Sequence, residues 1–138
     1  MFFKKKDIEN KNIFSTKICA LLIHAARIDE NYSIDEEDII KKTLIELGSN
    51  KNDILEIIEE AKIAEKNSNQ ILDFTREVKS LNEEDKIMIV EALWKIIYSN
   101  KNADIYETNL MRRLAGLLYV DSKIMGNIKD RIKKENLK

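Results

Sequence analysis

The sequence predicts an all-α protein, and three observations lead to that class. The 138 residues contain no proline and only three glycines, so they lack the turn residues that a sheet protein needs between its strands. Apolar residues recur with the spacing of amphipathic helices, and no segment alternates with the period of two that marks a strand. The third observation is an internal repeat, because a shift of 71 residues aligns one helix–loop–helix unit with another. We therefore expect about seven helices in two pseudo-symmetric halves of one domain.

The repeat aligns its two copies without a gap. The aligned segments are Leu22-Ile23 with Leu93-Trp94, Ile34-Asp35-Glu36 with Ile105-Tyr106-Glu107, and Ile39-Ile40-Lys41-Lys42 with Leu110-Met111-Arg112-Arg113. Neither half closes a core alone, so we expect the first and fifth helices to share the centre of the protein.

The first three helices each carry a local signal. The first helix, at 12–28, is apolar on nearly every face, which predicts a central, buried position. The second helix runs to about Leu47, where Gly48 can take the left-handed conformation that ends a helix. The third helix opens at Asn50 with Asp53, a residue pair typical of a helix start.

The last four helices follow the same logic. A short fourth helix opens at Ser68 or Asn69. Asn82 caps the fifth helix, at 83–99, whose first turn is acidic and so meets the positive end of the helix dipole. The sixth and seventh helices repeat the second and third, and we expect them at 105–119 and from Asp121.

Length, charge and cysteine content restrict the class of protein. The chain is long enough for one domain, residues 1–138, with a core at about 12–135 and residues 1–10 frayed. A net charge of −1 gives no general attraction to nucleic acid, and no apolar run is long enough to span a bilayer. A single cysteine, Cys19, excludes an internal disulfide and fits a reducing compartment. We therefore expect a cytoplasmic protein, and the abundance of Lys, Asn and Ile indicates a bacterial source.

Oxygen-bearing side chains gather in the two loops that the repeat relates. Alternating oxygen donors followed by a glutamate are the ligands that Ca²⁺ or Mg²⁺ prefers. The EF-hand signature fails here, because the sixth-position glycine is missing and Ile40 stands where the twelfth-position glutamate should be. The candidate cation ligands are Asp29, Asn31, Asp35, Glu36 and Glu107.

Helix capping is the alternative explanation for several of these residues. Ser33-x-x-Glu36 and Asp104-x-x-Glu107 both have the spacing of a capping box, and each cap is worth about 1 kcal/mol. Capping does not account for Asp29, because a carboxylate at the end of the preceding helix opposes its dipole. Both interpretations, a cation site and a pair of caps, therefore stay open.

The same residues resemble a known family. The pattern resembles the acidic motif of the TerB-like domains of bacterial tellurite-resistance and stress-response proteins over about residues 15–125. The matching positions are Ala26-Arg27-x-Asp29, Glu36 and Ile39 in the first half, and Leu93-Trp94, Tyr98, Asn100, Glu107 and Leu110-x-Arg112-Arg113 in the second.

The resemblance implies an all-helical fold with internal pseudo-symmetry, no established enzymatic activity, and a proposed cation-binding role for the loop acids, here Asp29, Glu36 and Glu107. The family's usual Asp-Gly is replaced here by Asp29-Glu30 in the first copy and by Asn100-Lys101 in the second. Because Asn100 lacks a charge and Lys101 adds a cation, the first loop is the favoured site.

Other reactive side chains have ordinary interpretations. His24 is the only histidine, which excludes a zinc site built from several histidines. Cys19 and Trp94 fall on buried helices and are expected in the core. No nucleophile–base pair and no phosphate-binding glycine loop is present, so the sequence predicts no enzyme.

The expected function is therefore a non-enzymatic, TerB-like stress-response module that binds a divalent cation through residues 29–37. The alternative is a protein-interaction module, in which the acidic segment 29–38 meets a basic partner and the loop acids serve only as caps. The basic C-terminal segment 123–138 of another copy fits that partner, which makes self-association part of this alternative. No nucleic acid and no membrane insertion is expected.

Overall fold

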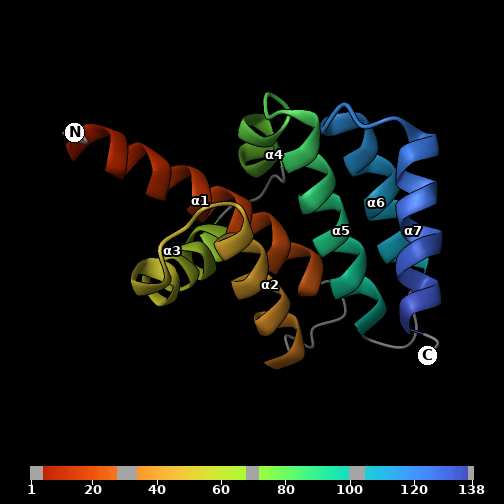
Figure 1. Cartoon of the computed structure of the whole chain (residues 1–138), viewed down its shortest axis with the longest axis horizontal. Helices are drawn as coiled ribbons and strands as arrows, with labels where there is room; N and C mark the ends of the chain where they lie inside the picture. The colour runs from red at the N-terminus through yellow and green to blue at the C-terminus, as the bar shows by residue number, and fades with distance from the viewer. Residues whose placement is uncertain (1–4, 28–33, 68–71, 100–104, 137–138) are drawn as a thin grey trace.

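The computed structural model describes residues 5–27, 34–67, 72–99 and 105–136 of the 138-residue chain. For residues 5–14, 77, 105–108 and 136 it describes the backbone only. These ranges contain seven α-helices and one 3-10 turn, and no strand (Figure 1). The predicted all-α class is therefore confirmed.

The bounds of the helices agree closely with the predictions at most positions. The elements are α1 (Lys5–Ala26), α2 (Ile34–Glu46), the 3-10 turn η1 (Lys51–Asp53), α3 (Ile54–Asn67), α4 (Leu72–Val78), α5 (Glu83–Ser99), α6 (Ile105–Leu117) and α7 (Ser122–Asn136). Helix α1 begins at Lys5 rather than near residue 12, because no glycine or proline interrupts the polar residues before the apolar stretch. It also ends at Ala26, two residues before the predicted end.

Side-chain caps hold the starts of three elements. Asn50 accepts a hydrogen bond from the amide of Asn52 at 3.1 Å and caps η1. Asn82 Oδ1 accepts from the amide of Asp85 at 2.9 Å and begins α5, as predicted. Asp121 accepts from the amide of Lys123 at 2.9 Å before α7. The predicted start of the fourth helix, Ser68 or Asn69, lies outside the described residues.

Helices α2 and α6 end in the same backbone motif. After α2, the amides of Gly48 and Ser49 donate to the carbonyls of Ile45 and Leu44, and Gly48 has a φ of 102°. After α6, the amides of Tyr119 and Val120 donate to the carbonyls of Gly116 and Ala115 with the same spacing, and Tyr119 has a φ of 55°. Both ends are therefore Schellman motifs, and Tyr119 takes a left-handed conformation that a bulky residue rarely adopts.

The core lies between α1 and α5 and the helices around them (Figure 1). Helix α1 packs against α2, α3, α4 and α5, whereas α5 also packs against α2 and α7. Every residue from Ile18 to Ile23 is at most 1% exposed, and Ile89, Val90 and Leu93 of α5 are fully buried. The expectation that the first and fifth helices share the centre is confirmed.

The repeat of 71 residues has a counterpart in the elements. The bounds of α2 and α6 coincide when one is shifted by that offset, and their terminal motifs fall on the equivalent residues Gly48 and Tyr119. Helix α1 packs on α3 as α5 packs on α7. The pseudo-symmetry of the two halves as whole units stays a prediction.

Candidate functional site

The candidate site lies where α1 ends and α2 begins. Residues 28–33, which join the two helices, are outside the described residues, so Asp29 and Asn31 are not placed. Glu107 lies in the first turn of α6, and its side chain is also outside the description. Of the five predicted ligands, the structure therefore places the side chains of Asp35 and Glu36.

The first turn of α2 presents its acids in different directions. Asp35 and Asp38 are exposed, whereas Glu36 is only 1% exposed. Glu36 shares a helix face with the buried Ile40 and Thr43, because residues three or four apart lie above one another on a helix. A buried carboxylate is costly unless its charge is compensated. Glu36 is therefore the acid of this turn that the protein holds inside the fold.

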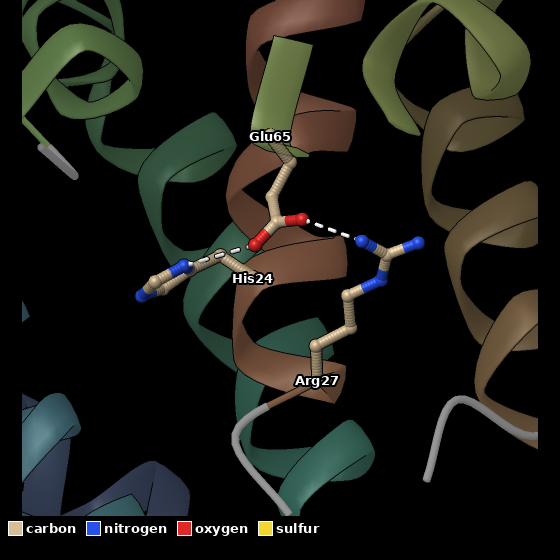
Figure 2. Close-up of polar contacts among 3 residues, drawn as sticks. All are labelled: His24, Arg27 and Glu65. Atoms are coloured by element: carbon tan, nitrogen blue, oxygen red, sulfur yellow. Dashed lines mark hydrogen bonds and ion pairs between the residues drawn. The ribbon is translucent and has the colours of Figure 1, made fainter. Parts of the chain in front are cut away.

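A carboxylate from α3 fixes the other side of the connection. Glu65 lies between His24, in the last turn of α1, and Arg27, which directly follows that helix, and one oxygen faces each of them (Figure 2). Arg27 Nη1 donates to Glu65 Oε2 at 2.9 Å, and His24 Nδ1 lies 3.3 Å from Glu65 Oε1. The Glu65 side chain is 12% exposed, whereas those of His24 and Arg27 are each 38% exposed. This cluster holds the end of α1 immediately before the acidic loop.

Sequence reasoning missed Glu65. Its contacts join residues 38 and 41 positions apart, and no local pattern predicts such a pairing. One signal was present, because Glu65 follows Ile58 and Ala61 at helical spacing and so falls beside the apolar stripe of α3. A carboxylate at that place needs a basic partner from the helix against which the stripe packs.

A comparison with known families decides what kind of domain this is. The family model of the tellurite resistance protein TerB matches residues 15–130, from the middle of α1 to the second half of α7. The chain belongs to the TerB family. Searches of the curated proteins and of the solved structures found no match. In this TerB domain, both Arg27 and Glu36 lie within the matched stretch.

The described part of the TerB domain does not itself form a complete metal centre. Among the residues that the structure places, no three or more His, Cys, Asp or Glu side chains are grouped so that they could hold a metal ion. Two of the acids nearby already have basic partners, since Glu65 pairs with Arg27 and Glu37 with Lys62. A cation site here therefore depends on residues 28–33 together with Glu36.

Cys19 and Trp94 both lie in the core of the domain. Burial raises the pKa of the Cys19 thiol from 9.0 to about 12, with a smaller lowering effect from Lys62 and a raising effect from Glu37. Cys19 is fully buried, so the prediction of a core thiol is confirmed. Trp94 is 3% exposed and stacks on Tyr98 with their ring centroids 5.8 Å apart. Its expected core position is likewise confirmed.

In the ranges that the structure covers, no helix combines the length and the apolar character needed to cross a bilayer.

Proposed function

We propose that this TerB domain is a non-enzymatic binding module whose first inter-helix loop, residues 29–37, binds a divalent cation, Ca²⁺ or Mg²⁺. The observation that carries the proposal is the position of Glu36, a side chain held inside the fold in the first turn of α2, directly after the oxygen-rich loop. The proposal includes a cytoplasmic role in a bacterial stress response, in keeping with the tellurite-resistance family to which the chain belongs.

The kind of side chain in this segment supports a cation as the ligand. Glu36 would supply one carboxylate, and the loop adds Asp29, Asn31 and Asp35 as oxygen donors. Oxygen ligands without a set of histidines favour a hard cation over Zn²⁺.

The anchored end of α1 supports the same site. Cation ligands bind most tightly when the protein holds them in place before the ion arrives. Glu65 fixes Arg27, and Arg27 is two residues before Asp29. The loop is therefore flanked on one side by Arg27, which Glu65 of α3 holds, and on the other by the buried Glu36 of α2.

Isothermal titration of Ca²⁺ and Mg²⁺ into four proteins tests the proposal. We expect the wild type to bind one of the ions, Asp29→Ala to abolish binding, and Glu36→Gln to weaken it at least tenfold. Glutamine still completes a capping box, so Glu36→Gln separates a lost ligand from a lost cap. Asp38→Asn, an exposed acid of the same turn, is the matched control and should bind as the wild type does. Equal affinities in all four proteins, or no binding to the wild type, would contradict a cation site.

Protein interaction is the second candidate function, and the exposure of charged residues favours it. Asp35 and Asp38 are exposed at the start of α2, and Lys123, Lys133 and Lys134 are exposed on α7. Charge-driven self-association between these segments should weaken as salt rises, because ions screen exposed charges. Light scattering across a salt series, with and without EDTA, distinguishes this candidate from a cation-dependent one. In this second candidate the loop acids act only as helix caps.

A further inference from the structure

A groove of about 440 Å³ opens where α3 and α4 both pack against α1. The described residues that line it are Thr16 and Lys17 of α1, Glu60 and Ala64 of α3, and Asp73, Phe74 and Arg76 of α4. We call it the α1–α3–α4 groove. Pockets for small molecules have volumes of about 300–1,000 Å³, so a small ligand fits here. The described lining includes no residue of α2, which separates the groove from the cation site proposed above.

Helical spacing explains why these side chains share one groove. Glu60 and Ala64 are four residues apart on α3, and Asp73 and Arg76 are three apart on α4. Residues at these spacings lie on the same face of a helix. Each of the two helices therefore turns one face, with at least one charged side chain on it, toward the groove.

Two apolar side chains form part of the lining. Phe74 is 5% exposed and belongs to the core, and Ala64 is half-buried. Because alanine has only a methyl group, α3 leaves space at this point that a longer side chain would fill. An apolar portion of a ligand therefore has a surface to contact.

The charged residues of the lining differ in how far they are already engaged. Lys17 and Asp73 each interact with other groups of the protein. Glu60 has one long contact, in which Thr16 Oγ1 donates to Glu60 Oε2 at 3.5 Å. Within the described residues, no hydrogen bond or ion pair involves the Arg76 guanidinium. Glu60 and Arg76 are therefore the charges of the groove that remain available to a ligand.

The opposite signs of these two charges define the ligand. The Glu60 carboxylate on α3 accepts hydrogen bonds from an ammonium group, and the Arg76 guanidinium on α4 donates to a carboxylate through two parallel bonds. Both side chains are exposed, so either contact alone contributes little. A ligand that carries both groups gains from the two contacts together, and its apolar body meets Ala64 and Phe74.

We propose that the α1–α3–α4 groove binds a small zwitterion with an apolar body, either a free apolar amino acid or a short peptide with free termini. Its ammonium group contacts Glu60, and its carboxylate contacts Arg76. The inference goes beyond the cation site, because it uses other helices and requires no ion.

Leucine and leucyl-leucine are the probes that test the proposal. Binding is followed in EDTA by the amide signals of the full-length protein in NMR spectra, which detect weak ligands. The tighter of the two probes identifies the source of the zwitterion, an amino acid or a peptide. Its N-acetyl form lacks the ammonium group, and its C-terminal amide lacks the carboxylate. We expect each of these forms to bind at least fivefold more weakly than the intact probe. Equal binding of the three forms, or no binding of either probe, would overturn the proposal.

Two variants assign each end of the ligand to its partner. Arg76→Gln should weaken the intact probe at least fivefold and change the affinity of the amide form less than twofold. Glu60→Gln should do the same for the intact probe and spare the N-acetyl form. Lys79→Gln and Glu59→Gln are the matched controls, because both residues are exposed and neither belongs to the described lining. Loss of binding in the controls, or equal losses for all forms of the probe, would overturn the assignment.

A larger side chain at position 64 tests the location of the site. Ala64→Leu should fill the groove and weaken the probe at least tenfold, and a thermal melt verifies that the variant is folded. Normal binding by the folded variant would contradict a site in this groove. Asp29→Ala should bind the probe as the wild type does, so a failure of the cation site is distinguished from a failure of this one. Loss of the probe in Asp29→Ala would overturn the separation of the two sites.

Discussion

At the scale of single residues, Glu65 does the most to define the candidate site. Its carboxylate accepts a hydrogen bond from Arg27 and lies 3.3 Å from His24 Nδ1, so it joins α3 to the end of α1. The side chain is 12% exposed, so its ion pair with Arg27 is better shielded from water than a pair on an open surface.

Replacing Glu65 tests how much this cluster stabilises the domain. Glu65→Ala should lower the free energy of unfolding by about 1–2 kcal/mol, because it removes the charged hydrogen bond between Arg27 and Glu65. Glu60→Ala is the control on the same helix, since Glu60 is exposed and makes only a 3.5 Å contact with Thr16. Urea unfolding compares the two. Equal losses from both variants would contradict a special role for Glu65.

Cys19 provides a prediction for pH dependence. Burial raises the pKa of its thiol from 9.0 to about 12, so the folded state retains a proton that the unfolded chain releases above pH 9. The stability is therefore complete below pH 9 and falls as the pH rises toward 12. Between pH 9 and pH 12, one such thiol lowers the free energy of unfolding by about 1.4 kcal/mol for each pH unit.

The comparison with Cys19→Val isolates this effect, because valine stands at the equivalent position of the repeat, Val90. The wild type should lose about 1.4 kcal/mol more than the variant between pH 8 and pH 10. Urea titrations at the two pH values measure the difference. Parallel pH profiles of the two proteins would show that the thiol is not protected from ionisation.

At the scale of elements, the sequence was informative wherever the signal was local. Asn82 and the acids after it predicted the start of α5, and Gly48 predicted the end of α2. The early start of α1 was missed, because its first residues are polar and carry no apolar periodicity. The left-handed Tyr119 was also missed, since a tyrosine gives no sign of the conformation that its repeat partner Gly48 adopts.

Two glycine substitutions should have opposite effects on stability. Gly48→Ala should destabilise the protein by about 1–2 kcal/mol, because an alanine is strained at a φ of 102°. Gly126→Ala should stabilise it by about 0.5–1 kcal/mol, because Gly126 is helical and a Cβ there meets nothing within 4 Å. Thermal unfolding of both variants measures the signs. A stabilising Gly48→Ala would contradict the Schellman motif at the end of α2.

At the scale of the whole molecule, the fold was predictable and the candidate site only in part. Helices that are apolar on every face must lie in the centre, so the shared core of α1 and α5 followed from composition. The pairing of Arg27 with Glu65 could not be predicted from the sequence, because that contact depends on tertiary packing between α1 and α3. The burial of Glu36 was also unforeseen, since the same sequence spacing fits an exposed cap.

The central claim is that the first loop of this TerB domain binds a divalent cation, and a thermal melt tests it most directly. The wild type, Asp29→Ala and Glu36→Gln are melted in EDTA and then in millimolar Ca²⁺, Mg²⁺, Mn²⁺ or Zn²⁺. An ion that binds only the folded state raises the midpoint by mass action. We expect a rise for the wild type with Ca²⁺ or Mg²⁺ that disappears in Asp29→Ala and shrinks in Glu36→Gln. An unchanged wild-type midpoint with every cation, or the same rise in all three proteins, would contradict it.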